Sequence, residues 1–264
     1  MFDYICTYHY GRCVKGNDWY LKSTGVNRVY YIHSGNVTVL LDNTPYYLKP
    51  GMIYLFPQNL KFELLLSEQT RVDHTFLDFS SLPAITMDGP IAVDPANAPV
   101  IAKAAQILFA LTEQHQTYPS MERNGYSDLV ESYLVNLLTL MDKQYGIHTI
   151  TDPRINRALD YIHHSYSSEI TLDQLSEITN LEKNYFVRLF KQNMNATPYQ
   201  YIKKYRFNMA LSLIKRGKTL SETALLVGYS DVASFSHAFK KIYGIAPSDV
   251  LRPRETEERA EKSL

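Results

Sequence analysis

The chain has 264 residues, of which 45% are hydrophobic, and this length and composition suit two domains with cores of their own. Its 27 basic side chains balance its 27 acidic ones, and it has two cysteines, Cys6 and Cys13. Uninterrupted apolar stretches fall far short of the ~20 residues that a membrane helix needs, and the first ten residues lack the features of a secretory signal. We therefore expect a cytoplasmic protein whose two thiols are reduced bystanders rather than a disulfide or a zinc site.

Residues 1–92 have the pattern of a β-domain, in which short runs rich in Tyr, Val, Ile and Phe alternate with turns. Many short strands of this kind are typical of a sandwich or a barrel. The predicted strands are Arg28–His33, Val37–Leu41, Tyr46–Leu48, Ile53–Phe56, Phe62–Leu66 and His74–Phe79. The stretch Tyr46–Pro57, with Leu48-Lys49-Pro50-Gly51 at its centre, resembles part of a cupin-type barrel. This resemblance implies a cupin-like β-barrel over residues 1–92.

Enzymes of the cupin group, which this segment resembles, bind a metal through a His-x-His pair, a carboxylate and a later His. The sequence has no His-x-His pair, His33 and His74 are isolated, and Lys61 stands near the place of the later His. We therefore predict no metal, no other cofactor and no catalytic residue. The alternative is a metal-dependent cupin enzyme fused to a second module.

The β-domain also carries candidates for an effector pocket. Aromatic rings suit stacking on a sugar or an aromatic effector, and a guanidinium can pair with the carboxylate of a small organic acid. The candidates are Trp19, Tyr20, Arg28, Tyr30, Tyr46, Tyr54 and Phe56. The alternative is that these aromatic side chains only form the barrel core, in which case the barrel is a ligand-free scaffold.

Two amphipathic helices are predicted next, over residues 95–116 and 122–145. The second helix gathers its apolar side chains on one face, which consists of Leu129, Tyr133, Leu134, Leu137, Leu138, Met141 and Tyr145. This face either forms a homodimer with a second chain or packs only on the barrel. We expect the homodimer and assign residues 93–148 to a helical linker and dimerisation region.

Residues 171–254 contain one pattern twice. Thr171-Leu172, Asn180, Phe186, Phe190-Lys191 and Pro198 in the first copy correspond to Thr219-Leu220, Gly228, Phe235, Phe239-Lys240 and Pro247 in the second. A short capped helix, a turn that needs a permissive residue and a second helix make a helix-turn-helix. Two such motifs in tandem predict a protein that places two helices in major grooves of DNA.

Each copy has its own start and stop signals. Thr171 precedes Gln174, and Thr219 precedes Glu222, by the three residues of a capping box. The first helix of each copy should end at the corresponding turn residue, Asn180 or Gly228, because both types tolerate a left-handed backbone. Ser230 or Asp231 should cap the next helix of the second copy. The side chains expected to face inward are Leu172, Leu175, Ile178, Phe186, Leu189, Phe190, Phe235, Ala238 and Phe239.

A long helix is predicted between the copies, with Thr197 as its cap, Pro198 in its first turn and Gly217 at its end. A stiff connector would fix the distance between the two reading helices, and successive major grooves on one face of DNA lie ~34 Å apart. One chain should therefore bind one site with two half-elements. A further helix, opened by Asp152-Pro153, should pack against the first copy.

The charge distribution agrees with a nucleic-acid partner. Residues 183–254 hold 13 Lys and Arg against 3 Asp and Glu, whereas residues 1–182 hold 12 against 20. A basic block on a helical module is the electrostatic footprint of a nucleic-acid binder. The neutral total conceals this asymmetry.

These residues resemble the AraC/XylS family of bacterial transcription regulators. The resemblance is carried by Tyr185-Phe186-Val187-Arg188-Leu189-Phe190-Lys191, Thr197-Pro198-Tyr199-Gln200-Tyr201-Ile202, Tyr205-Arg206-Phe207, Ala210-Leu211, Val227-Gly228-Tyr229-Ser230-Asp231, Ser234-Phe235-Ser236-His237-Ala238-Phe239-Lys240-Lys241 and Gly244-Ile245-Ala246-Pro247. It covers about 100 residues in the right order and spacing, which makes it far more specific than a short motif.

The resemblance implies which exposed residues contact DNA. The implied base-reading residues are Asn184, Val187 and Arg188 in the first copy and Ala233, Ser234 and His237 in the second. An arginine can bind guanine and an asparagine adenine through paired hydrogen bonds. Lys191, Lys240 and Lys241 are expected on phosphates, which position a protein without specifying sequence.

Two departures from the family pattern bear on function. Asn195 stands where the family often has Gly, and His237 where it commonly has Arg. A neutral imidazole is a weaker partner for guanine or phosphate than a guanidinium. We therefore expect the first copy to read sequence more sharply than the second.

Together these features predict an α+β protein: an N-terminal cupin-like barrel, a helical linker, and an all-α DNA-binding domain over residues 152–254 with two helix-turn-helix motifs joined by a long helix. Residues 255–264 are charged and are expected to be a frayed tail. The expected partners are double-stranded promoter DNA, RNA polymerase, a small-molecule effector and a second copy of the chain, and no membrane. Whether the chain activates or represses is left open.

Overall fold

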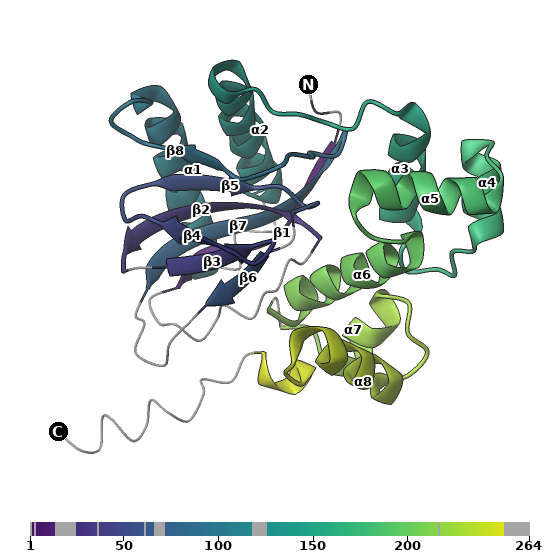
Figure 1. Ribbon diagram of the computed structural model, residues 1–264. Coiled ribbons are helices and arrows are strands. Elements are labelled where there is room, and N and C mark those ends of the chain that lie inside the picture. The colour runs from purple at the N-terminus through teal and green to yellow at the C-terminus, as the bar shows by residue number, and fades with distance from the viewer. Residues whose placement is uncertain are drawn as a thin grey trace, which may run out of the picture.

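The computed structural model describes residues 2, 4–13, 25–35, 37–60, 62–65, 72–117, 126–215 and 217–250. The candidates Trp19 and Tyr20, Lys61 and the tail 255–264 lie outside these residues. Figure 1 shows an N-terminal half of strands and two helices, and a C-terminal half made of helices. The fold class is therefore α+β, as predicted.

The described strands form two antiparallel sheets. The five-stranded sheet has the order β1-β7-β2-β5-β8, and the three-stranded sheet has the order β4-β3-β6. The strands are β1 (Tyr4–Cys13), β2 (Asn27–Ser34), β3 (Val37–Leu41), β4 (Thr44–Leu48), β5 (Ile53–Phe56), β6 (Phe62–Leu65), β7 (Asp73–Leu82) and β8 (Ile91–Val93). Hydrogen-bonded closure into a barrel is not seen among these strands, so we call the unit the two-sheet domain.

Alternation along β2 sends its side chains to two different cores, because successive residues of a strand face opposite sides. Tyr30 and Ile32 point into the space between the two sheets, where they pack with residues of β3 and β5. Val29 points to the other side and joins a core shared with two helices. This alternation places Arg28 with Tyr30, and Tyr31 with His33, on opposite faces of the five-stranded sheet.

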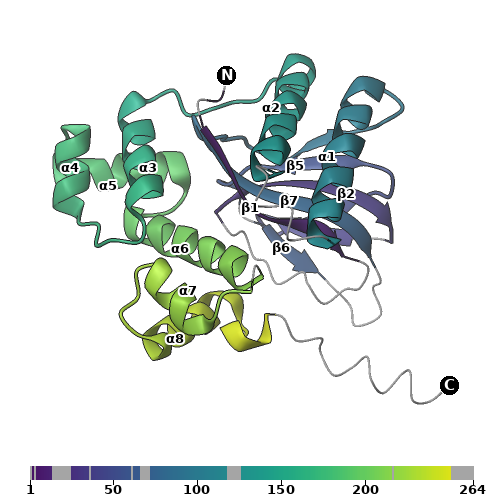
Figure 2. The same cartoon turned by 180° about the vertical axis from the view of Figure 1, so that it is seen from behind.

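Helices α1 (Pro99–Thr117) and α2 (Tyr126–Tyr145) cover the outer face of the five-stranded sheet, as Figure 2 shows from behind. The apolar face around Leu134 lies inside this layer: Leu134, Leu137, Leu138 and Met141 are all 0% exposed. The expectation that these side chains meet a second chain was therefore wrong. They are used in packing α2 onto α1 and the sheet of the same chain.

The C-terminal half begins at the helix that Asp152-Pro153 was predicted to open. It consists of α3 (Pro153–Ser165), α4 (Leu172–Thr179), α5 (Lys183–Met194), α6 (Pro198–Lys215), α7 (Leu220–Leu226), α8 (Val232–Tyr243) and the 3₁₀ turn η2 (Pro247–Asp249). Asp152 caps α3 by accepting a hydrogen bond from the backbone N–H of Arg154 at 2.9 Å. We call α4–α5 the first motif and α7–α8 the second motif.

The two halves share a core. Val26, Leu82 and Ala84 of the two-sheet domain are buried in one cluster with side chains of α3, α4, α5 and α6. The second motif has a separate cluster, which it builds with the C-terminal part of α6. The first motif is therefore packed on the two-sheet domain, whereas the second is packed on α6.

Six predicted strands and the predicted helices agree with the structure within a few residues. β1 and β8 were not predicted; β1 mixes Tyr, Thr, His and Gly without clear alternation, and β8 has only three residues. Within the described residues, no helix combines the length and the apolar character needed to cross a membrane.

Candidate nucleic-acid interface

The first motif starts with the predicted capping box. The backbone N–H of Gln174 donates to Thr171 Oγ1 at 3.2 Å, and the N–H of Thr171 donates to Gln174 Oε1 at 2.8 Å. α4 ends at Asn180, whose φ of 53° is left-handed, as expected. Leu172 does not face inward: it is 41% exposed, because the first turn of α4 projects beyond the core that covers Leu175.

The second motif repeats this arrangement with a tighter turn. Thr219 and Glu222 form the capping box, and α7 ends at Leu226, two residues before the predicted stop. Gly228 has φ of +81°, and a Cβ built on it would lie 2.6 Å from the carbonyl oxygen of Ser167. Glycine is thus required at this turn both by backbone conformation and by close approach of the chain that follows α3.

The second helix of each motif begins at an acidic cap. Glu182 accepts a hydrogen bond from the N–H of Tyr185 at 3.0 Å, and Asp231 accepts one from the N–H of Ser234 at 2.7 Å. The backbone N–H groups of Asn184 and then Tyr185 lower the pKa of Glu182, and the N–H of Ser234 lowers that of Asp231. Asp231 was one of the two predicted caps, whereas Glu182 was not predicted, because glutamate is not among the favoured N-cap residues.

α5 presents three of its four predicted DNA contacts to solvent. Asn184, Arg188 and Lys191 are exposed, and Val187 is half-buried against the core of the first motif. The guanidinium of Arg188 lies 5.9 Å from the ring centre of Tyr185, and this contact can hold the side chain clear of the helix. Contact of these residues with bases stays a prediction.

α8 presents smaller side chains in the corresponding positions. Its predicted contacts, all exposed, are Ala233, Ser234, His237, Lys240 and Lys241. Phe235 and Phe239 are 0% exposed on the opposite side of the helix and fix its rotation. The surface of α8 therefore offers two lysines for phosphates and few groups with a fixed hydrogen-bond pattern.

α6 belongs to both motifs. Thr197 caps it by accepting from the N–H of Gln200 at 3.3 Å, and Gly217, with φ of 82°, follows its end. Tyr201 and Tyr205 of its first half pack in the core of the first motif, and Phe207 and Ile214 of its second half pack in that of the second. Its 18 residues correspond to a rod of about 27 Å.

Arg206, in the middle of α6, ties the motifs together. Its Nε donates to the carbonyl of Tyr166 and its Nη2 to that of Ser168, both at 2.6 Å, and its Nη1 reaches the carbonyl of Gly228 at 3.5 Å. One guanidinium thus holds the segment after α3 beside the turn of the second motif. Burial lowers the pKa of Arg206 from its ordinary value.

The candidate effector residues that the structure describes lie between the two sheets. Tyr30, Tyr54 and Phe56 are buried there, and Tyr46 packs against them. Arg28 is buried as well; it forms an ion pair with Asp78, and its Nη1 donates to the hydroxyl of Tyr30 at 2.7 Å. The structure brings these five candidates together, and the pairing with Asp78 is what the sequence did not indicate.

Among the described residues, no three His, Cys, Asp or Glu side chains come together in a way that could hold a metal ion. His33 and His74, the isolated histidines of the sequence, face opposite sides of the sheet because they occupy alternate faces of β2 and β7. His74 is 3% exposed, and burial lowers its pKa to about 3.

Comparisons with known proteins agree with this geometry. A family described as a helix-turn-helix domain matches residues 175–253. The probable transcriptional regulator LumQ of Photobacterium leiognathi is 27% identical over 222 residues, which cover 81% of this chain and 84% of that protein. The lactose operon transcription activator of Staphylococcus xylosus is 31% identical over 137 residues, or 49% of each chain.

Solved structures share the overall fold. Unsaturated fatty acid bound wild-type ToxT from Vibrio cholerae strain SCE256 has a TM-score of 0.60 at 14% identity, over 94% of this chain and 90% of that chain. A second structure of ToxT from Vibrio cholerae has a TM-score of 0.57 at 16% identity, over 94% and 99%. The likeness extends over both halves of the molecule.

Proposed function

We propose that the chain is a DNA-binding transcription regulator of the AraC/XylS family, that it reads two half-elements of one promoter site and that it responds to a small organic acid. The observation that carries the first part is the sharing of α6 between two capped helix-turn-helix motifs. A helix whose two halves lie in two cores cannot bend freely between them. The helices α5 and α8 are therefore held at a fixed separation and enter successive major grooves of the DNA together.

The two probes differ in chemistry, and this supports a division of labour. α5 carries an asparagine and an arginine, which can each make paired hydrogen bonds with one base. α8 carries Ala233, Ser234 and His237, together with Lys240 and Lys241 at its end. We infer that α5 supplies most of the sequence discrimination and that α8 supplies mainly affinity through the phosphates.

Base-pair substitution across a bound promoter tests this inference. Arg188→Ala should cost ~1–3 kcal/mol of discrimination at one base pair, whereas Lys240→Ala should weaken all sequences alike and lower the salt slope by about 1. Lys143→Ala, an exposed lysine of α2, is the matched control and should change neither quantity. Equal discrimination penalties in both half-elements would contradict the division of labour.

The space between the sheets supports an acidic effector. A buried guanidinium must be neutralised, and a carboxylate can do so through two parallel hydrogen bonds. Arg28 now makes such a contact with Asp78, and aromatic rings surround it: its Cζ lies 5.3 Å from the ring centre of Tyr30 and 5.4 Å from that of Phe76. We infer that the carboxylate of an effector competes with Asp78 for Arg28 within a cupin-like sensor. The fatty acid bound to ToxT is of this chemical class.

A route from this site to the DNA-binding half supports the response. Tyr243, near the end of α8, is buried and donates a hydrogen bond to Asn208 of α6 at 2.8 Å. Burial raises the pKa of Tyr243, and the charges of Asp78 and Arg28 act on the same phenol. A change in the Arg28–Asp78 pair would therefore be felt where α8 meets α6.

Thermal unfolding with hexanoate, benzoate and a panel of neutral sugars tests the effector. An acid at 100-fold excess over its Kd should raise Tm by about 5 °C or more. The control is the double variant Arg28→Leu with Asp78→Leu, since losing one partner alone would leave a buried charge. It should fold and lose the response. A response to sugars alone would replace the acid, and no response to any compound would favour a ligand-free scaffold.

Homodimerisation and contact with RNA polymerase complete the proposal. The face around Leu134 is buried within the chain, so we assign the dimer contact to α1. Val100 and Ile107 lie seven residues apart on one face of this helix and are 64% and 47% exposed. Sedimentation should show a dimer that Ile107→Glu dissociates; a wild-type monomer at micromolar concentration would contradict it. Transcription with purified polymerase then distinguishes an activator from a repressor.

A further inference from the structure

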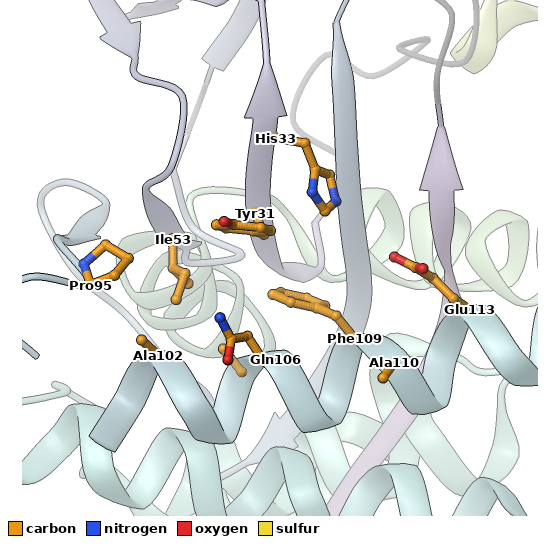
Figure 3. A pocket seen from close by; sticks show the side chains of 10 residues that line it. Tyr31, His33, Ile53, Pro95, Ala102, Gln106, Phe109, Ala110 and Glu113 are labelled. Carbon is orange, nitrogen blue, oxygen red and sulfur yellow. The ribbon is translucent and has the colours of Figure 1, made fainter. Parts of the chain in front are cut away.

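Two aromatic side chains with different surroundings lie on α1 and on α5. Where α1 crosses β2 and β5, a cavity of about 190 Å³ is lined by rings that already stack on each other. Figure 3 shows Tyr31 and Phe109 facing each other, and their ring centres are 6.1 Å apart with planes within 16° of parallel. Tyr185 of α5, in contrast, is 42% exposed and presents its ring to a side chain that is implied in DNA binding.

Tyr185 and Arg188 are neighbours on the surface of α5, because residues three apart on a helix lie side by side. The guanidinium carbon of Arg188 lies over the ring of Tyr185, 5.9 Å from the ring centre. Tyr185 is in the first turn of α5, so this contact holds the guanidinium near the start of the helix. In a helix-turn-helix the N-terminal residues of the second helix are the ones that contact base edges.

The electrostatics at the start of α5 agree with this placement of the guanidinium. The backbone N–H groups of Asn184 and then Tyr185 lower the pKa of Glu182, and the charge of Arg188 lowers it further. Glu182 is the cap of α5, so Arg188 acts on the first turn of its own helix. Helical side chains in general lean toward the N-terminus in this way.

The ring of Tyr185 is contacted from α3 as well. Arg154, in the first turn of α3, donates two hydrogen bonds to Asp152, from Nε at 3.0 Å and from Nη2 at 2.7 Å. The pairing with Asp152 is the main cause that raises the pKa of Arg154, and the nearby hydroxyl of Tyr185 adds to it. Tyr185 therefore lies between a guanidinium of α3 at its hydroxyl and a guanidinium of α5 at its face.

A guanidinium that stacks on a ring keeps its N–H donors at its edge, where they can form paired hydrogen bonds with O6 and N7 of guanine. Binding costs less when a long side chain has already lost part of its rotamer freedom. The second motif has a different pair at these positions, because Ser234 stands where α5 has Tyr185 and His237 where it has Arg188. The ring thus belongs to the motif with the stronger hydrogen-bonding side chain.

We propose that Tyr185 is a positioning residue for base reading, which holds the guanidinium of Arg188 in the orientation that binds one base and does not itself read the DNA. This inference rests on the proposed function, in which Arg188 discriminates at one base pair of the first half-element. It makes the sharpness of that discrimination depend on an aromatic ring beside the reading side chain.

Discrimination is measured with the full chain as the ratio of Kd values for a bound promoter and for promoters with single base-pair substitutions in the first half-element. Arg188→Ala identifies the base pair at which this ratio falls. Tyr185→Leu removes the ring and should lower the ratio at the same base pair about two- to fivefold, as loss of a cation–π contact at an exposed site predicts. Tyr185→Phe keeps the ring and should retain most of the discrimination.

The double variant distinguishes positioning from direct contact. In the Arg188→Ala background, Tyr185→Leu should cause no further loss, because the side chain that it positions is gone. A further loss in that background would mean that Tyr185 contacts DNA by itself and would overturn the proposal. Uniformly weaker binding to all promoters with a lower Tm would overturn it too, since a purely structural role has that result.

The remaining outcomes separate this inference from the proposed function. A loss of discrimination in Arg188→Ala with none in Tyr185→Leu would overturn the inference and leave the proposed function intact. Unchanged discrimination in Arg188→Ala at every base pair would overturn both. Tyr47→Leu, which replaces a 67% exposed tyrosine of β4, is the matched control and should bind every promoter like the wild type.

Discussion

The two helix-turn-helix motifs share a pattern but not a setting. The core of the first contains Val26, Leu82 and Ala84 of the two-sheet domain, whereas the buried core of the second consists of residues 207–243 of the helical half. The first motif is therefore positioned directly by the two-sheet domain, and the second is positioned by α6 and by Arg206. A signal that changes the separation of α5 and α8 can therefore act through α6, through Arg206, or where Tyr243 of α8 meets Asn208 of α6.

The turns of the two motifs give the largest expected difference. Gly228→Ala must place a Cβ 2.6 Å from Ser167 O at a left-handed φ, so we expect it to destabilise the second motif by about 3 kcal/mol. Asn180→Ala has the left-handed strain without a close approach and should cost about 1 kcal/mol. Urea unfolding measures both, and Asn180→Gly is the matched control, which should be neutral or stabilising. Equal costs for the two alanine variants would contradict the close approach at Gly228.

Acid should weaken the core that α3 and α6 share with the first motif. His163 is buried, stacks on Tyr205 at 4.5 Å and hydrogen-bonds Tyr201, and burial lowers its pKa to about 3. The unfolded chain binds this proton below about pH 6.5 and the folded chain does not, so stability is present above pH 6.5 and is lost as pH falls toward 3. The loss from His163 should be ~2.5 kcal/mol at pH 4.5.

Carboxylates also contribute to the pH dependence of the free energy of unfolding. The contribution of His163 is therefore measured as the difference between the variant and the wild type. Urea midpoints of His163→Phe should fall less between pH 7 and pH 4.5 than those of the wild type. His148→Gln, an exposed histidine outside this core, should keep the wild-type slope. The corresponding polar pair of the second motif, Tyr243 with Asn208, stays neutral throughout this range because the pKa of Tyr243 is raised. A wild-type slope in His163→Phe would refute the assignment.

Loss of the hydrogen bonds that Arg206 donates should reduce the free energy of unfolding by a somewhat smaller amount. Arg206→Ala removes two short charged hydrogen bonds from a half-buried side chain and should cost about 2 kcal/mol. It should also let the second motif open without the first, which hydrogen exchange would detect as lower protection in α7 and α8 alone. Lys203→Ala, a neighbouring basic residue of α6, provides the control. Uniform loss of protection across both motifs would show that Arg206 does not couple them.

The capping boxes should give the smallest and most equal effects. Thr171→Ala and Thr219→Ala each remove one acceptor at an exposed helix start and should each cost about 1 kcal/mol. Thermal unfolding of the two variants should therefore differ little. A much larger loss for Thr219→Ala would mean that α7 depends on its cap more than on its packing against α6.

Local signals allowed much of the helical half to be predicted. Capping boxes, the left-handed Asn180 and the glycine turns act over a few residues, so they are readable without tertiary information. What could not be predicted arises from contacts between distant segments. Arg28 meets Asp78 across 50 residues, and the cavity joins Tyr31 to Phe109 across 78. No local pattern marks such pairs, and the exposure of Leu172 depends in the same way on where α4 docks.

The central claim is that α6 holds α5 and α8 at one fixed separation. The most direct test is the affinity of the full chain for a bound promoter in which base pairs are inserted between the two half-elements. A single optimum, with a five-base-pair insertion reducing affinity to that of one half-element alone, is the predicted result, because the second element then lies on the opposite face of the duplex. Affinity that is unchanged by the insertion would contradict the account.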